Sequence, residues 1–349
     1  MAKELLVEGH KISDNEPCYV IAEIGANHMG SLENAKQMFL AAKRSGVDAV
    51  KMQKRDNTSL FTQKMYDMAY VNDNSFGDTY GEHREAVEFG KEEYQELQKY
   101  ANEIGITMFA TPFDIPSADF LRDLDMPAYK TASADITNTP LLKYIASFGK
   151  PMFVSTGAAT MSDVERAYDA IMPINQNLCL LQCTSSYPVE PNEMNLKVIQ
   201  TYKERFPDIV IGLSDHQNGI AMALVGYVLG ARVIEKHFTI NRSWRGTDQP
   251  FSLEESGLNK LVRDLHRANI AFGDGVKKPF DSEKKTMYKL GKKLVASRDL
   301  PNGHVLQEND LSVKIPNDGI PPYEIDNVIG KKITKDVIKD ENISFDYLT

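Results

Sequence analysis

The sequence predicts an α/β chain in which a (β/α)8 TIM barrel is followed by a small β-rich module. Eight short apolar runs recur before about residue 275, and a pattern of helical period follows each. Most runs are apolar throughout, as expected for parallel strands covered on both faces. A doubly wound open sheet is the alternative, but the number of units favours a closed barrel.

The predicted strands are rich in Val, Ile, Phe and Met, and they cover residues 18–25, 49–55, 107–113, 128–133, 151–157, 178–185, 209–215 and 232–239. The helix after the first strand is expected to be capped by Ser31 and to end at Gly46. Before the last barrel helix, Ser252 and Glu255 have the spacing of a capping box.

Two departures from this regular pattern indicate the domain organisation. The segment 56–90 is long and polar; on a barrel it would leave the C-terminal end of a strand, where it could cover a site. Near Gly273 the composition changes to Gly, Pro and Lys. We therefore expect a barrel domain over 1–275, a linker over 276–293 and a β-rich module over 294–349.

Composition excludes several classes of protein. The chain has 349 residues, 40 basic and 49 acidic, and a formal charge of −9, which disfavours binding to nucleic acid or an anionic membrane. Cys18, Cys179 and Cys183 form no CxxC pair and are expected to be reduced thiols. We find no signal-peptide pattern, no apolar run long enough for a membrane span and no dinucleotide or Walker motif, so the expected location is cytoplasmic.

The predicted strands deliver polar side chains at their C-terminal ends, where barrel enzymes place their chemistry. In chain order these are Glu23, Asn27, His28, Lys51, Gln53, Thr111, Lys130, Ser133, Asp135, Ser155, Thr156, Thr184, Ser185, Tyr187, Ser214, Asp215, His216, Glu235, Lys236 and His237. Lysines with hydroxyl groups suit a phosphate, and each charge-assisted bond contributes roughly 1.5–3 kcal/mol. Two histidines on adjacent strands suit a divalent metal with open coordination positions.

Each of these residues also has an ordinary structural explanation. A lysine at a strand end is usually a surface charge, a single buried histidine usually makes a structural hydrogen bond, and a serine often caps the next helix. Their common position at the strand ends is what favours a site.

Several motifs resemble the sialic acid (N-acetylneuraminate or N-acylneuraminate-9-phosphate) synthase family. They are IAEIGANHMGS, VKMQK, FATPFD, YKTASADITN, VSTGAAT, LQCTSSYP, IGLSDHQNG and VIEKHFT. FGDTYGEHR and SWRGTDQPFSLE resemble the branch that includes the animal sialic acid phosphate synthases. The segment that begins LVASRDLPNGHVL resembles the antifreeze-like (SAF) domain that ends these proteins, so the resemblance covers nearly the whole chain.

The resemblance implies an enzyme that condenses phosphoenolpyruvate with N-acetylmannosamine or its 6-phosphate, giving N-acetylneuraminate or its 9-phosphate and inorganic phosphate. It implies that His216 and His237 bind a divalent metal (Mn²⁺, Mg²⁺ or Co²⁺), and that two copies form a domain-swapped homodimer. The implied catalytic residues are Glu23, Lys51, Lys130 and Asp135. Those implied to bind phosphoenolpyruvate are Lys51, Thr111, Lys130, Ser133, Ser155, Ser185 and Ser214. Those implied to face the sugar are Glu23, Gln53, Asn74, Tyr187 and Asp248.

Three positions depart from the best-known bacterial members: Ser185 replaces Asn, Asp135 replaces Glu and Ile315 replaces an Arg that reaches the sugar. The animal branch shares the last two changes, so the choice between free and 6-phosphorylated sugar stays open. Three alternatives also stay open. The first is a synthase of another nonulosonic acid (legionaminic, pseudaminic or deaminated sialic acid). The others are a Schiff-base aldolase with Lys130 or Lys51 as nucleophile, and a non-catalytic binding protein that works through its antifreeze-like module.

Overall fold

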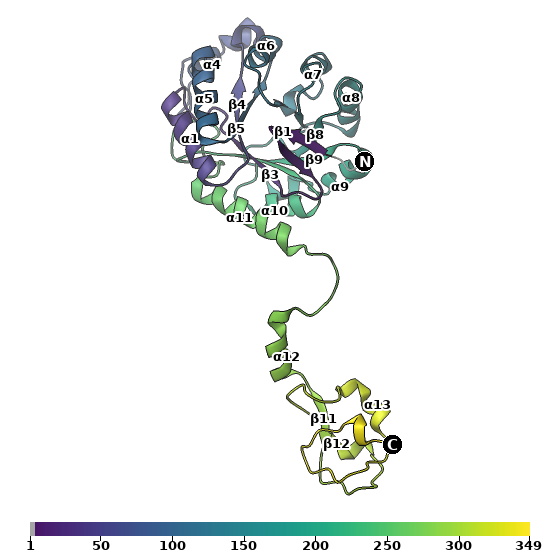
Figure 1. Ribbon diagram of the computed structural model, residues 1–349. Coiled ribbons are helices and arrows are strands. Elements are labelled where there is room, and N and C mark those ends of the chain that lie inside the picture. The colour runs from purple at the N-terminus through teal and green to yellow at the C-terminus, as the bar shows by residue number, and fades with distance from the viewer. Residues whose placement is uncertain (1–3) are drawn as a thin grey trace. The chain divides into compact units, whose positions relative to one another are not determined.

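The computed structural model describes residues 4–349 (Figure 1). Residues 1–3, the start of the predicted barrel domain, lie outside the described residues. The chain forms two compact units, one ending at Gly273 and the other spanning Asp274–Thr349. Within residues 4–349, no helix has the length and apolar character needed to cross a membrane.

The first unit is a closed barrel of eight parallel strands. They are β3 (Tyr19–Glu23), β4 (Ala49–Lys54), β5 (Thr107–Pro112), β6 (Tyr129–Thr131), β7 (Met152–Ser155), β8 (Leu178–Cys183), β9 (Val210–Asp215) and β10 (Val233–His237). β10 pairs with both β9 and β3, from Val233 opposite Tyr19 to His237 opposite Glu23. The barrel predicted from the sequence is therefore confirmed, and the open sheet is wrong.

Helices surround the strands, and their apolar faces pack against the outside of the barrel (Figure 1). They are α1 (Leu32–Arg44), α5 (Lys91–Ile104), α6 (Ile115–Asp123), α7 (Thr139–Ala146), α8 (Met161–Ile171), α9 (Val198–Arg205), α10 (Ala221–Val228) and α11 (Glu255–Ala271), with short 3₁₀ turns at Ser133–Asp135 and Pro191–Glu193. Ser31 Oγ accepts a hydrogen bond from Asn34 N, and Gly46 follows α1 with a φ of 82°, so the predicted cap and stop of α1 are confirmed.

The predicted capping box of α11 is wrong. This helix begins at Glu255 after Glu254, and no side chain caps it. The Ser252 hydroxyl instead accepts from Asn27 Nδ2 at 2.9 Å and donates to the Asp248 carbonyl at 2.6 Å. The hydroxyl group is used by the loop before the helix, so it is not available to the helix N-terminus.

A hairpin that the sequence did not predict fills the barrel interior at its N-terminal end. Strands β1 (Glu4–Val7) and β2 (His10–Ser13) pair antiparallel. Leu5, Val7 and Ile12 of the hairpin share a core with inward-facing barrel residues such as Tyr19 and Phe109. The interior is therefore a packed core beneath the strand ends.

The segment 56–90, named here the β4–α5 insertion, is not a plain loop. It contains α2 (Asn57–Leu60), α3 (Gln63–Tyr66) and α4 (Tyr80–Glu85). Thr79 and Glu82 form a capping box at the start of α4. An ordered insertion can hold side chains over the strand ends.

The second unit begins with a 3₁₀ turn (Asp281–Glu283) and α12 (Lys284–Leu290), so the predicted linker is partly helical. Strands β11 (Lys293–Ala296) and β12 (Leu311–Lys314) pair antiparallel. The unit also contains α13 (Ile325–Val328) and 3₁₀ turns at Glu308–Asp310, Pro322–Glu324 and Phe345–Tyr347. Its own apolar core is built from Leu294, Ala296, Leu300, Leu306, Ile320, Val328, Ile333, Val337 and Ile343.

Candidate active site

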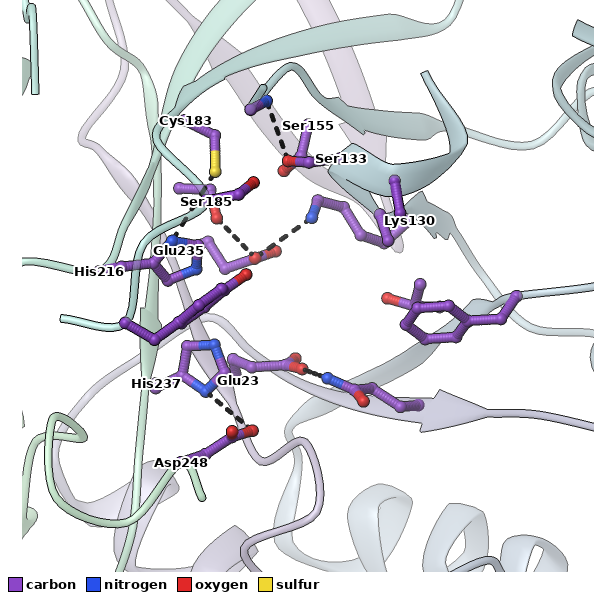
Figure 2. A pocket seen from close by; sticks show the side chains of 18 of the residues that line it. Glu23, Lys130, Ser133, Ser155, Cys183, Ser185, His216, Glu235, His237 and Asp248 are labelled. Carbon is purple, nitrogen blue, oxygen red and sulfur yellow. Dashed lines mark hydrogen bonds and ion pairs between the residues drawn. The ribbon is translucent and has the colours of Figure 1, made fainter. Parts of the chain in front are cut away.

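A cavity of about 640 Å³ opens at the C-terminal ends of the barrel strands (Figure 2). All eight strands, or the residues just after them, contribute to its lining. Alternation along each strand directs every second side chain inward, which places Lys51 and Gln53 of β4, and Glu235 and His237 of β10, on the cavity wall.

Four charged side chains form the cavity floor: Glu23, Lys51, Lys130 and Glu235, each at most 4% exposed. Lys51 Nζ lies 2.6 Å from Glu23 Oε2 and donates to Thr111 Oγ1 at 2.9 Å. Lys130 Nζ lies 3.2 Å from Glu235 Oε1. Ser214 Oγ also donates to Glu235 Oε1, at 3.0 Å. Lys51 Nζ also lies 3.8 Å from Glu235 Oε2, so the floor is a connected set of two lysines and two carboxylates.

The two carboxylates of the floor have different protonation properties. Burial alone would raise the pKa of Glu235, but Lys130 and Lys51 hold it at about 2. Burial raises the pKa of Glu23 above its ordinary value, although Lys51 opposes this. Burial lowers the pKa of Lys130. Glu235 is therefore a fixed negative charge, and Glu23 is the carboxyl better suited to exchange a proton.

Serine hydroxyls gather beside Lys130, and a glycine makes room for them. A Cβ on Gly157 would lie 2.1 Å from Ser185 Oγ and 2.8 Å from Ser133 Oγ, so only glycine fits there. Ser133 Oγ accepts from Gly157 N at 2.9 Å. Ser155 Oγ is buried and has no hydrogen-bond partner among the described residues. Hydroxyls with unused donors next to an ammonium group suit a bound oxyanion.

His216 and His237 lie beside the floor, with ring centroids 5.3 Å apart (Figure 2). His216 Nδ1 lies 3.0 Å from the Thr184 carbonyl, which can only accept, so Nδ1 carries a proton and Nε2 is the nitrogen that could bind a metal. Burial lowers the pKa of His216, but Cys183 and the Thr184 carbonyl outweigh it and hold that pKa above its ordinary value. His237 Nδ1 is buried without a hydrogen-bond partner and lies 3.7 Å from Asp248 Oδ2. Burial lowers the pKa of His237 to about 3, so its imidazole is neutral.

These two imidazoles fit a divalent metal with several open positions. Across residues 4–349, no group of three or more His, Cys, Asp or Glu side chains is arranged as a metal site. Only the two histidines would therefore bind the ion directly, leaving the remaining positions to water or substrate.

Nearly all the residues implied by the resemblance meet at this cavity. It is lined by Glu23, Lys51, Gln53, Thr111, Lys130, Ser133, Ser155, Ser185, Tyr187, Ser214, His216, His237 and Asp248. Asn74 and Asp135 are not among the lining residues. Asn74 Oδ1 accepts from Gly246 N at 3.2 Å and so links the β4–α5 insertion to the loop after β10. Asp135 is buried in a 3₁₀ turn, where it accepts from Asn138 Nδ2 at 3.3 Å.

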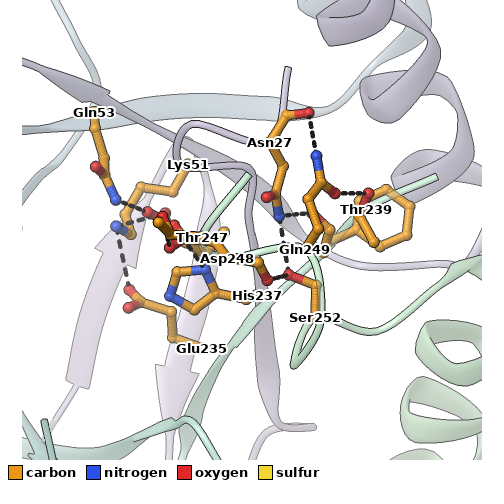
Figure 3. A network of polar contacts seen from close by, with 12 residues as sticks. Asn27, Lys51, Gln53, Glu235, His237, Thr239, Thr247, Asp248, Gln249 and Ser252 are labelled. Atoms are coloured by element: carbon orange, nitrogen blue, oxygen red, sulfur yellow. Dashed lines mark hydrogen bonds and ion pairs between the residues drawn. The ribbon is translucent and has the colours of Figure 1, made fainter. Parts of the chain in front are cut away.

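A hydrogen-bond network holds the loop after β10 against the end of β3 (Figure 3). Asn27 Nδ2 donates to the Phe238 carbonyl and to Ser252 Oγ, both at 2.9 Å. Gln249 Nε2 donates to the Asn27 carbonyl at 3.0 Å. This network fixes the loop that carries Asp248 at the cavity. Asn27 was noted in the sequence as a strand-end residue but was given no role.

Sequence reasoning missed four further residues that line the cavity, Arg55, Tyr70, Tyr80 and Arg84, which are named here the rim. Arg55 continues the inward alternation of Lys51 and Gln53, so the period of two could have revealed it. Tyr80 and Arg84 come from α4 of the insertion, which no strand-end pattern marks. Glu235 was also noted at a strand end but was not recognised as the partner of Lys130.

Residues 38–277, more than half of the chain, match the NeuB family, and residues 293–349 match the SAF domain. The chain belongs to the NeuB family. It is similar to the N-acetylneuraminate-9-phosphate synthase of Homo sapiens, with 40% identity over 339 residues, which cover 97% of this chain and 94% of that protein.

Other relatives have different names. The N,N'-diacetyllegionaminic acid synthase of Legionella pneumophila is 36% identical, covering 91% of this chain and 90% of that protein. A solved structure of the N-acetylneuraminic acid synthetase of Leptospira borgpetersenii, in complex with citrate, superposes with a TM-score of 0.71 and 33% identity over 82% of this chain and 95% of that one. The relatives support a synthase and leave its sugar open.

Proposed function

We propose that this NeuB-family synthase condenses phosphoenolpyruvate with N-acetylmannosamine or its 6-phosphate. The observation that carries the proposal is the floor, where two buried lysines and a set of serine hydroxyls adjoin the imidazoles of His216 and His237. Phosphoenolpyruvate carries a phosphate and a carboxylate, and two ammonium groups with several hydroxyl donors are suited to hold both.

In the proposed reaction the methylene carbon of phosphoenolpyruvate bonds to the aldehyde carbon of the open-chain sugar, whose oxygen takes up a proton. Water then adds to C2 of the former enol and gives up a proton. The C2–O bond to the phosphate breaks, so inorganic phosphate leaves, and loss of the C2 hydroxyl proton produces the ketone. Phosphoenolpyruvate, sugar and water are thereby converted to the keto acid and phosphate.

The residues have distinct proposed roles. Lys51 and Lys130 would hold the anionic groups in the ground state and stabilise the departing phosphate. Glu23, whose pKa burial raises, would accept the proton that water loses. Gln53 Nε2 donates to Glu23 Oε1 at 2.6 Å and would orient that carboxyl toward the sugar. Tyr187 and Asp248 would contact the sugar beside the histidines.

His216 and His237 are proposed to bind Mn²⁺, Mg²⁺ or Co²⁺. A metal ion in that position would polarise the sugar aldehyde as a Lewis acid. A His237→Ala enzyme that kept full activity and an unchanged Mn²⁺ affinity would contradict this assignment.

A Schiff-base aldolase is the second candidate, because burial lowers the pKa of Lys130 and so favours the neutral amine. The hydrogen bond from Lys130 Nζ to Glu235 favours the protonated lysine instead. Borohydride trapping of a sugar or pyruvate adduct on Lys130, without a metal requirement, would decide for the aldolase.

The direct test is phosphate release from phosphoenolpyruvate by the purified protein with Mn²⁺. The acceptors are N-acetylmannosamine, its 6-phosphate, mannose 6-phosphate and a diacetamido-hexose, each with and without EDTA. Release with a mannosamine acceptor that EDTA abolishes supports the proposal. Release with the diacetamido-hexose alone assigns another nonulosonic acid, and no release with any acceptor contradicts the proposal.

Pairing of two copies and a cytoplasmic location remain predictions. Support for pairing comes from apolar side chains at the start of the second unit that are more than half exposed: Phe280, Met287, Tyr288 and Leu290. Light scattering should give twice the chain mass of 39.2 kDa if the protein pairs.

A further inference from the structure

Arg84 is a cavity-lining cation without an acidic partner. Its Nε and Nη2 both donate to Tyr80 Oη, at 3.1 and 3.0 Å. Among residues 4–349, no carboxylate forms an ion pair with it. A half-buried guanidinium whose only side-chain hydrogen bonds go to a neutral phenol keeps most of its capacity to bind an anion.

Arg55 lines the same part of the cavity and is held rigidly. Its guanidinium stacks 3.8 Å from the centroid of the Phe113 ring, and its Nη2 donates to Gln53 Oε1 at 2.7 Å. Burial and the neighbouring Arg84 both lower the pKa of Arg55, so the two guanidinium groups repel each other. Glu88 lies 3.7 Å from Arg55, but Lys54 binds it more closely, at 3.1 Å.

Arg84 of the rim differs from the two floor lysines in its carboxylate partners. Lys51 and Lys130 each have a carboxylate within 3.2 Å, whereas no carboxylate of the described part of the chain pairs with Arg84. The rim is nonetheless built precisely, since a Cβ on Gly81 of α4 would lie 2.4 Å from the Tyr66 ring. Two guanidinium groups that line one cavity and repel each other are suited to share a divalent anion.

The rim and the floor lie along one wall. The cavity is lined by three alternate residues on and just after β4, namely Lys51, Gln53 and Arg55. The first and the last of these, Lys51 and Arg55, are separated by about 13 Å along the strand. An extended sugar with its aldehyde near the floor would pass Gln53 and end near Arg55. The terminal carbon of a hexosamine is therefore the atom whose substituent reaches the rim.

From this arrangement we infer that Arg84, with Arg55 and Tyr80, binds a phosphate on the terminal carbon of the sugar, so the preferred acceptor is a phosphorylated hexosamine. The inference rests on the proposed function and decides between its two acceptors. Arg84 and Arg55 are specificity residues and take no part in bond making.

The experiment measures kcat/KM for N-acetylmannosamine and for its 6-phosphate with saturating phosphoenolpyruvate and Mn²⁺. The proteins are the wild type, Arg84→Met, Arg84→Lys and the control Arg166→Met, which removes an exposed arginine that pairs with Asp163 outside the cavity. We expect the wild type to prefer the phosphorylated sugar and Arg84→Met to narrow that preference by about 10- to 100-fold. Arg84→Lys should recover part of the preference, and Arg166→Met should match the wild type.

The results that contradict the inference can be told apart from those that contradict the proposed function. A wild type that prefers the free sugar, or a preference that Arg84→Met leaves unchanged, overturns the inference while the proposed function stands. The comparison of kcat/KM for the two sugars uses the wild type alone, so it tests the inference even if a variant does not fold. If the wild type releases phosphate with neither of the two sugars, the proposed function is overturned and this inference with it. The KM for phosphoenolpyruvate should not change in Arg84→Met, because the floor is intact.

Discussion

The floor and the rim of the cavity are both cationic, but they are built differently. Floor side chains project from barrel strands, are almost fully buried and are paired with carboxylates. Rim side chains come from the residue after β4 and from an insertion of short helices, and within residues 4–349 the side-chain hydrogen bonds of Arg84 all go to Tyr80. The floor is thus part of the barrel's own polar core, whereas the rim is a separate structure placed over it.

Because the floor and the rim come from different elements, the two parts can change independently. Altering a floor residue leaves a buried charge without its partner, which affects both chemistry and folding. If the rim binds the far end of the sugar as proposed, altering a rim residue would change which substituent that end can carry, while the floor lysines stay in place.

The largest effect is expected from Lys130→Met, which tests the floor. The change removes a cation proposed to stabilise the departing phosphate, and loss of one such donor typically lowers turnover by about 10²- to 10³-fold. Steady-state phosphate release should therefore show a fall in kcat of that size for both acceptors, since the floor does not distinguish them.

Lys150→Met is the matched control for Lys130→Met, because Lys150 is an exposed lysine paired with Asp125. Its kinetics should equal those of the wild type. Circular dichroism should show that Lys130→Met is still folded. If the folded variant turned over phosphoenolpyruvate at the wild-type rate, the floor would not be the phosphate site.

A smaller effect is expected from Gly81→Ala, which displaces the rim without removing a polar group. The added Cβ would lie 2.4 Å from the Tyr66 ring, so α3 and α4 must separate, and Tyr80 and Arg84 must move. We expect KM for the sugar to rise about tenfold, because misplacement by about 1 Å can cost that much or more. KM for phosphoenolpyruvate should stay within twofold.

Glu85→Ala is the control for Gly81→Ala, since Glu85 is an exposed residue at the end of the same helix. If Gly81→Ala raised KM for the sugar and KM for phosphoenolpyruvate equally, the floor and the rim would be mechanically coupled. They could then not be treated as two independent parts.

The same contrast explains what the sequence could predict. Parallel strands covered on both faces give continuous apolar runs, and their ends are visible as sudden polar residues such as Lys51 and His237. Because a barrel brings all those ends to one side, residues far apart in sequence were correctly expected to meet at one cavity.

The remaining features lacked such a signal. Arg84 reaches the cavity because short capped helices fold back over it, and this depends on tertiary packing around Tyr66 and Gly81. The Ser252 hydroxyl has the spacing of a helix cap, but a buried amide, Asn27, competes for it. The N-terminal hairpin is too short to be recognised without the barrel interior against which it packs.

The smallest effect concerns Asp135, a buried carboxyl that does not line the cavity. Burial raises its pKa to about 6, and the unfolded value is about 3.9. A carboxyl with a raised folded pKa keeps its proton in the folded state while the unfolded chain releases it. Its contribution to stability is therefore lost as pH rises from about 4 to about 6, and the penalty persists above that.

Asp135→Asn removes this titration and keeps the shape of the side chain. The stability of the variant relative to the wild type should consequently increase by about 1 kcal/mol between pH 5 and pH 8. Urea unfolding at the two pH values measures the difference, with Asp123→Asn as an exposed control that should show no such gain. A variant that lost stability relative to the wild type on going to pH 8 would mean that hydrogen-bond donors or cations stabilise the ionised Asp135 in the folded protein more than burial disfavours it, and the raised pKa would be wrong.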